Sequence, residues 1–129
     1  MVAEDDFVSR NALMFLLQGY GDVDAAVNGA EGLDAFEMAL KTGEAYSLIF
    51  MDIMMPEMDG MEAAKKIRDL EKEYGVAPRN EAKIIMATAL SDPKSVFTAF
   101  NKSKATEYLV KPCEPQSIRE AMTRAGVIG

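Results

Sequence analysis

Short apolar segments alternate with longer amphipathic segments along this chain of 129 residues. The segments LIFM at 48–51 and KIIMAT at 83–88 are compact apolar runs, which is typical of strands buried on both faces. Between such runs, apolar side chains recur every three or four residues, as in Leu33, Phe36 and Leu40, which is typical of helices. This alternation predicts an α/β fold with a parallel sheet and helices on both of its faces.

We expect one domain over residues 1–129, with five strands and five helices. The expected strands cover 1–3, 23–27, 48–51, 83–88 and 107–110. The expected helices run from about 9 to 18, across 33–42, onward from about 60, from 92 to about 102, and onward from about 114. Ser9 is the expected N-cap of the first helix, and Asp59 that of the third.

Composition excludes several classes of function. The chain has no histidine, which excludes Ser-His-Asp and Cys-His catalysis, zinc sites built on imidazole, and a phosphohistidine carried by the chain itself. The net charge of −7 argues against sequence-independent binding of nucleic acid, which needs basic side chains. Cys113 is the only cysteine, and the longest apolar run, at 12–17, is too short to span a bilayer. The first residues, MVAEDD, show no secretory signal, and we expect a cytoplasmic chain without membrane contact.

Acidic, hydroxyl and basic side chains stand where the expected strands end. These are Glu4, Asp5 and Asp6 after the first strand, Asp52 after the third, Thr88 at the end of the fourth and Lys111 after the fifth. The carboxyl ends of parallel strands share one edge of the sheet, so these side chains are expected to meet there.

This combination of side chains points to phosphoryl chemistry. Clustered carboxylates raise one another's pKa unless a cation compensates, and a set of oxygen ligands without His or Cys favours Mg2+. A carboxylate beside Mg2+ and a lysine forms a receptacle for a phosphoryl group, with Asp52 placed as the nucleophile. A single aspartate at a strand end is more often a helix cap or turn former. The coincidence at several strand ends favours a functional site.

Four motifs occur in order between the expected elements: EDD at 4–6, MDIMMPEMDG at 51–60, ATA at 87–89 and YLVKP at 108–112. With them, essentially the whole chain resembles the receiver domain of bacterial two-component response regulators. The resemblance implies a flavodoxin-like, doubly wound sheet of five parallel strands in the order 2-1-3-4-5, with five helices.

The resemblance also implies roles for individual residues. Asp52 is expected to accept a phosphoryl group from a phosphohistidine on a sensor histidine kinase or a histidine phosphotransfer protein. Asp6 and Asp52 are expected to bind Mg2+ directly, together with the backbone carbonyl of Met54, while Asp5 holds a metal-bound water. Lys111 is expected to pair with Asp52 and then with the phosphoryl oxygens, and its peptide bond to the following proline is expected to be cis.

Signalling is expected to follow from a shift between two conformations. Thr88 is expected to bond to the new phosphate, and Tyr108 to turn inward behind it. This change reshapes the face of the fourth helix, fifth strand and fifth helix, which would bind a downstream protein or a second phosphorylated copy. The chain is thus expected to be a signalling phosphoacceptor, which catalyses only its own phosphotransfer and slow dephosphorylation.

Some positions depart from the family pattern. The first strand is short, and Lys104 stands where a left-handed backbone is often required. Met54 and Leu90, two residues after Asp52 and Thr88, are apolar and unable to orient a hydrolytic water, which predicts a long-lived phosphoryl group.

Two alternative functions remain open at this stage. One is a phosphorylation-independent docking module with a disabled site. The other is a phosphohydrolase with an aspartate nucleophile, although such enzymes want a second acid at the position of Met54. A stand-alone receiver and an excised domain are equally compatible with the sequence.

Overall fold

The computed structural model describes residues 1–89, 94, 97–98, 101 and 104–128, and within them lies one five-stranded sheet. All neighbouring strands are parallel, and the strand order β2-β1-β3-β4-β5 confirms the expected order 2-1-3-4-5. The strands are β1 (Val2–Ala3), β2 (Ala25–Ala26), β3 (Leu48–Asp52), β4 (Lys83–Thr88) and β5 (Glu107–Val110).

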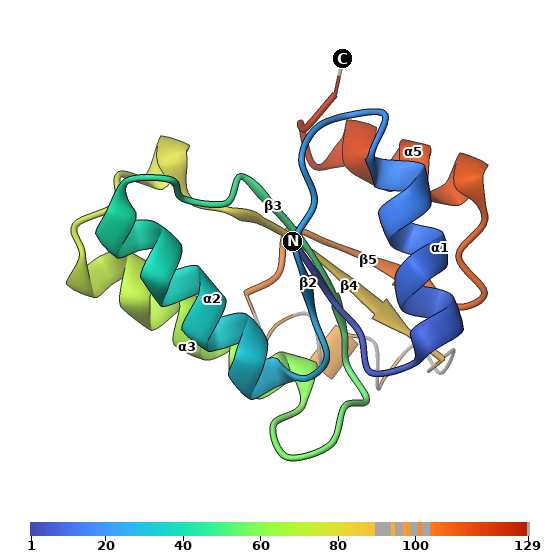
Figure 1. Cartoon of the computed structure of the whole chain (residues 1–129), viewed down its shortest axis with the longest axis horizontal. Helices are drawn as coiled ribbons and strands as arrows, with labels where there is room; N and C mark the ends of the chain where they lie inside the picture. The colour runs from blue at the N-terminus through green and yellow to red at the C-terminus, as the bar shows by residue number, and fades with distance from the viewer. Residues whose placement is uncertain (90–93, 95–96, 99–100, 102–103, 129) are drawn as a thin grey trace.

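The helices pack in two layers, one on each face of the sheet. They are α1 (Phe7–Leu17), α2 (Gly29–Thr42), α3 (Gly60–Glu73) and α5 (Pro115–Arg124), with a short 3-10 helix η1 (Pro78–Asn80). Figure 1 shows α2 and α3 side by side on one face and α1 with α5 on the other. The helix expected from 92 to about 102 falls mostly on residues outside the described part, so the last helix is numbered α5. None of the described helices has the length and apolarity needed to cross a membrane.

Alternation along the central strands divides the core between the two faces. In β3, Ile49 and Met51 pack with α2 and α3, whereas Phe50 packs with α1 and α5. In β4, Ile84 joins the first cluster and Ile85 the second. Because successive side chains of a strand point to opposite faces, an unbroken apolar run fills both layers at once.

Side-chain caps fix where three helices begin. Asn28 caps α2 and Asp59 caps α3, each accepting a hydrogen bond from the backbone N–H three residues onward. The expected cap of α1, Ser9, is wrong: α1 begins earlier, and its N-cap is Asp6, whose Oδ2 accepts from the Ser9 N–H at 2.8 Å. The helix therefore starts two residues before the position expected from the sequence. The spacing of apolar side chains predicts that a helix is present more reliably than it predicts the residue at which the helix begins.

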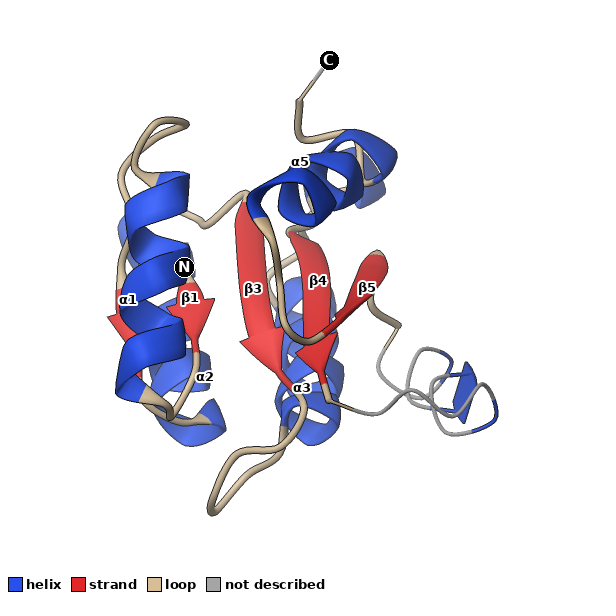
Figure 2. Cartoon of the chain, turned by 90° about the vertical axis from the view of Figure 1, so that its right-hand side faces the viewer, coloured by secondary structure: helices blue, strands red, loops and turns tan. Residues whose placement is uncertain are grey.

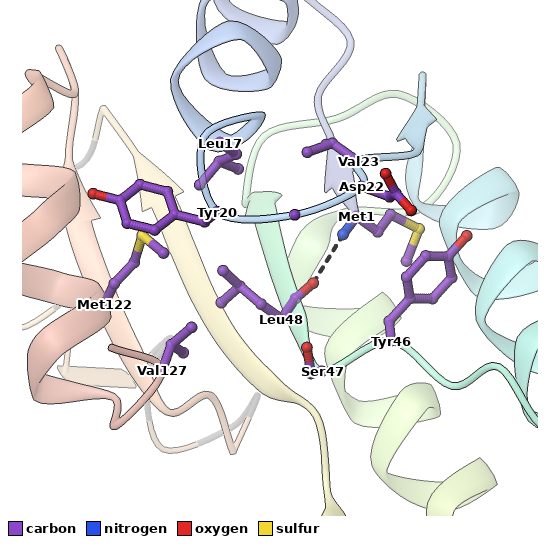
Figure 3. A pocket seen from close by; sticks show the side chains of 11 residues that line it. Met1, Leu17, Tyr20, Asp22, Val23, Tyr46, Ser47, Leu48, Met122 and Val127 are labelled. Atoms are coloured by element: carbon purple, nitrogen blue, oxygen red, sulfur yellow. Dashed lines mark hydrogen bonds between the residues drawn. The ribbon is translucent and has the colours of Figure 1, made fainter. Parts of the chain in front are cut away.

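A hollow lies at the amino-terminal edge of the sheet, beside Met1 and Leu48. This cavity has a volume of about 130 Å³. Figure 3 shows Leu17, Leu48, Met122 and Val127 among the side chains around it. The amino group of Met1 donates to the Leu48 carbonyl at 2.8 Å, and burial lowers the pKa of this amine to about 6. β1 is therefore anchored between β2 and β3 even though it contributes only two residues to the ladder.

Candidate functional site

Four strands deliver side chains or loops to the carboxyl edge of the sheet. In Figure 2 the arrowheads of β1, β3 and β4 point to this edge, where the loop after β3 projects. Asp52 ends β3 with 5% of its surface exposed, and Thr88 ends β4 with 1% exposed. Buried polar side chains at the ends of adjacent strands are costly unless they are paired or bind a ligand.

The ammonium group of Lys111, which follows β5, links the residue after β1 to the residue that ends β3. Its Nζ donates to Glu4 Oε1 at 2.7 Å and to Asp52 Oδ2 at 3.0 Å. Burial alone lowers the pKa of Lys111, but its bonds to Glu4 and Asp52 outweigh that effect and raise it. The peptide bond between Lys111 and Pro112 is cis, as predicted. The expected pairing of Lys111 with Asp52 is present in this conformation.

Three carboxylates converge beside this lysine. Oxygen atoms of Glu4, Asp5 and Asp52 lie within 4.8 Å of one another. Glu4 is 1% exposed, and its Oε2 has no hydrogen-bond partner among the described residues. Burial, with the nearby carboxylate of Asp52, raises the pKa of Glu4 to about 7 despite the contact with Lys111. The cluster is therefore short of positive charge in the absence of a ligand.

The carboxylate of Asp6, an expected metal ligand, is not part of this group. It caps α1, and the bond from Ser9 lowers its pKa. Arg10 also stabilises the turn between β1 and α1, because its Nη1 donates to the backbone carbonyls of Glu4 and Asp5 at 2.9 and 3.3 Å. The structure thus brings together Glu4 and Asp5 with Asp52, and leaves Asp6 on the exposed start of the helix.

Glu4 is the site residue that was missing from the expected ligands. A signal for it exists in the sequence, because Glu4 is the first acid after the apolar residues of the first strand. Its backbone N–H bonds to the Ala26 carbonyl at 3.0 Å, so Glu4 still follows the path of the strand. Glu4 and Asp5 leave the end of β1 together, and their carboxylates meet that of Asp52 in the same cluster.

The loop after β3 wraps closely around Asp52. The Met54 N–H donates to Asp52 Oδ1 at 3.2 Å, while the Met54 side chain is 64% exposed. Gly60 closes the loop, because its N–H bonds to the Ile53 carbonyl at 2.8 Å. A Cβ at Gly60 would collide with the backbone carbonyl of Asp52, so only glycine fits here without a shift of the backbone.

Thr88 ends the inner strand β4, and Tyr108 lies on the neighbouring edge strand β5. The Thr88 carbonyl accepts from the Lys111 N–H at 2.7 Å, which ties the ends of β4 and β5 together. Tyr108 is 37% exposed, on a strand whose register aligns it with Met86. The roles of both residues in a switch stay predictions.

The sequence is similar to receiver domains over nearly its whole length. A family model described as "Response regulator receiver domain" matches residues 1–123. The chain is 31% identical over 130 residues to hybrid signal transduction histidine kinase L of Dictyostelium discoideum, covering all of this chain but 7% of that kinase.

Solved structures show the same arrangement of strands and helices. The receiver domain of the Arabidopsis thaliana histidine kinase CKI1, complexed with Mg2+ and BeF3−, gives a TM-score of 0.78 at 29% identity, covering 95% of this chain and 87% of that one. The Saccharomyces cerevisiae receiver domain of Ssk1, crystallised with the phosphotransfer protein Ypd1, gives 0.80 at 26% identity, covering 98% and 87%.

Proposed function

The chain belongs to the family of response regulator receiver domains, and on that premise we propose that Asp52 accepts a phosphoryl group from a phosphohistidine of a partner protein. The observation that carries the proposal is the cluster of buried Glu4 and Asp52 with exposed Asp5, to which Lys111 is bonded through Glu4 and Asp52. Members of this family are signalling phosphoacceptors. The cluster offers a nucleophile, a compensating cation and one buried carboxylate oxygen, Glu4 Oε2, without a partner among the described residues.

The donor set fits a hard divalent cation. Every candidate side-chain ligand is a carboxylate oxygen, and the buried Oε2 of Glu4 has no partner among the described residues. We propose that Asp5 and Asp52 hold Mg2+ and that Glu4 contributes through Oε2, with the Met54 carbonyl as the backbone ligand implied by the family. Mg2+ bound there would neutralise charge on the transferred phosphoryl oxygens. The direct ligand role expected for Asp6 has no support from its position at the helix cap.

Phosphotransfer exchanges one bond to phosphorus for another. A carboxylate oxygen of Asp52 attacks phosphorus, the N–P bond to the partner's imidazole breaks, and the imidazole nitrogen keeps the electron pair and takes up a proton. Lys111 then moves its donor from the Asp52 carboxylate to a phosphoryl oxygen. The Met54 N–H holds the other carboxylate oxygen and orients the nucleophile.

The signal leaves the site through the strands that end there. We expect the hydroxyl of Thr88 to bond to the phosphoryl group and Tyr108 to turn inward from its half-exposed position. These contacts exist only in the phosphorylated protein, so they stabilise a conformation that the free protein samples rarely. The face of β5 and α5 is the surface we expect a downstream protein, or a second phosphorylated copy, to read.

An apolar surface beside the site suits a helical phosphodonor. On α1, Phe7, Val8 and Phe15 are 67%, 72% and 77% exposed. A groove of about 200 Å³ runs between α1 and the segment that follows β5, and Lys111 lines it. Exposed apolar side chains in such number mark an interaction surface, and this one reaches the lysine of the phosphorylation site. We propose that the sensor kinase or phosphotransfer protein docks here.

Intact-mass measurement with acetyl phosphate tests the proposal. We expect a gain of one phosphoryl group that requires Mg2+ and is absent in Asp52→Asn. A control substitution, Asp59→Asn, keeps a capping side chain in the same loop and should leave labelling intact. No gain in a folded protein would contradict the proposal and favour the docking module that needs no phosphorylation. Phe15→Ser should slow transfer from a phosphohistidine protein but not from acetyl phosphate.

A further inference from the structure

A charged hollow lies at the amino-terminal ends of β4 and β5, away from the carboxyl edge of the sheet that holds Asp52. It is a cavity of about 290 Å³ beside the C-terminal half of α3, and its charged lining residues are Arg68, Lys72, Glu81, Lys83 and Lys104. Lys83 begins β4, and Lys104 stands three residues before β5. The hollow therefore has no contact with the phosphorylation site, which is formed at the carboxyl ends of the same strands.

The side chains around this hollow carry a net positive charge, whereas the molecule as a whole is negatively charged. The chain carries a net charge of −7, yet three lysines face one carboxylate, Glu81, around this cavity. Within the described part of the chain, Lys72, Lys83 and Lys104 form no ion pair, whereas the Arg68 guanidinium is bonded to Glu71. The lysines thus leave an excess of two positive charges for a ligand.

A buried network holds the frame of this hollow. Arg68 Nη1 donates to Glu71 Oε1 at 2.7 Å and to the Ala82 carbonyl at 2.8 Å. Glu71 Oε2 accepts from the Ala82 N–H at 2.7 Å, and Arg68 Nε donates to the Lys104 carbonyl at 3.2 Å. The start of β4 and the turn before β5 are therefore both fixed to α3 through two buried side chains.

Lys104 occupies this turn with a strained backbone. Its φ is 54°, in the left-handed region that costs a residue with a Cβ about 1 kcal/mol or more. Glycine would adopt this conformation without that cost, so the lysine adds nothing to the turn itself. What this lysine supplies in place of a glycine is an ammonium group at the rim of the cavity.

We propose that this hollow is a binding site for a small phosphate-bearing anion, with pyrophosphate or a phosphorylated small molecule as the ligand class. Lysine ammoniums are compact point charges that bind phosphate groups, and the Arg68 guanidinium lies in the wall with its Nη2 free of partners among the described residues. The cavity has the volume of a small-ligand site. An extended polyanion such as DNA is disfavoured, because the rest of the surface is acidic.

A titration with inorganic pyrophosphate, followed by the backbone amide NMR spectrum at constant ionic strength without Mg2+, tests this site. We expect saturable shifts at residues 68–72, 81–84 and 104–106. Lys72→Gln and Lys83→Gln should each weaken binding by about tenfold, the effect of one charged hydrogen bond. Lys104→Gly removes the ammonium while suiting the left-handed turn, and it should weaken binding similarly.

The matched control is Lys65→Gln, which removes an exposed lysine of α3 that does not line the cavity. It should leave the affinity unchanged. Equal weakening by Lys65→Gln and Lys72→Gln would overturn the proposal, because it would show attraction to overall charge. Shifts centred on Asp52 and Lys111 would also overturn it, since they would place the anion at the phosphorylation site. Shifts that grow linearly without saturation would show that no site exists.

Discussion

Replacement of Glu4 by glutamine should stabilise the metal-free protein at alkaline pH. Glu4 is buried, and its pKa is raised from 4.5 to about 7, so its ionised form is disfavoured in the folded state. The folded protein binds a proton here more tightly than the unfolded chain between these two pH values. The wild-type free energy of unfolding therefore loses this contribution as pH rises through that window.

The size of the effect follows from the shift in pKa. Each pKa unit corresponds to about 1.4 kcal/mol, so the rise from 4.5 to about 7 means that ionised Glu4 costs at most about 3.5 kcal/mol above pH 7. Glu4→Gln removes that cost but also weakens the bond to Lys111, which leaves an expected gain of about 1–2 kcal/mol. Well below pH 4.5 the wild-type side chain is protonated in both states, and the two proteins should then be about equally stable.

Urea denaturation followed by far-UV circular dichroism, with chelator present, measures this difference across the pH range. Glu44→Gln is the control, because Glu44 is exposed and its removal changes the net charge by the same amount. A Glu4→Gln protein that is less stable than wild type at pH 8 would refute the reasoning, and so would a difference that does not vary with pH. Added Mg2+ should stabilise wild type more than Glu4→Gln, since the variant lacks one ligand.

Three further substitutions test other parts of the structure. Gly60→Ala should lower the free energy of unfolding by about 1–3 kcal/mol through collision with the carbonyl of the phosphoacceptor, whereas Gly19→Ala, which meets open space, should be nearly neutral by the same denaturation assay. Arg68→Met should lower the free energy of unfolding by about 3–5 kcal/mol, because it leaves the buried carboxylate of Glu71 without its ion-pair partner. Adding Glu71→Gln should recover part of that loss in urea unfolding. Met54→Asn should shorten the half-life of the phosphorylated protein by roughly tenfold, because an amide can orient the hydrolytic water; unchanged decay by intact mass would contradict this.

The sheet was predictable because its central strands carry strong, redundant signals. The runs around Ile49 and Ile84 are apolar on both faces, which identifies them as central strands without further information. The second strand was expected over 23–27, but only Ala25 and Ala26 pair with β1. Its length depends on how much of its neighbour is available to pair with, and β1 itself has only two residues.

The site was predictable in its location and less so in its ligands. Asp52 and Lys111 stand alone at their strand ends, so each position was unambiguous. The run of Glu4, Asp5 and Asp6 offers three acids for a site that receives two, and spacing does not decide among them. What decides is the start of α1, where Asp6 is taken up as the N-cap. That boundary depends on local hydrogen bonds rather than on the hydrophobic pattern.

The buried network of Arg68 and Glu71 was not predictable from sequence. The two residues lie three apart on a helix, a spacing that usually marks an exposed ion pair. Their burial arises because Ala82 and Lys104, far along the chain, close over them. By contrast, the family resemblance pointed to a left-handed backbone at Lys104, with a different turn as the alternative, and its φ of 54° confirms the left-handed conformation.

The central claim is that the carboxylate of Asp52 becomes an acyl phosphate. The most direct measurement is reduction of the acetyl phosphate-treated protein with borohydride, which converts an aspartyl phosphate to homoserine, followed by peptide mass spectrometry. We predict homoserine at position 52 only, in amounts that fall to background when Mg2+ is withheld. Homoserine at Asp5 or Asp6, or none in a protein that carries the phosphoryl mass, would contradict this assignment.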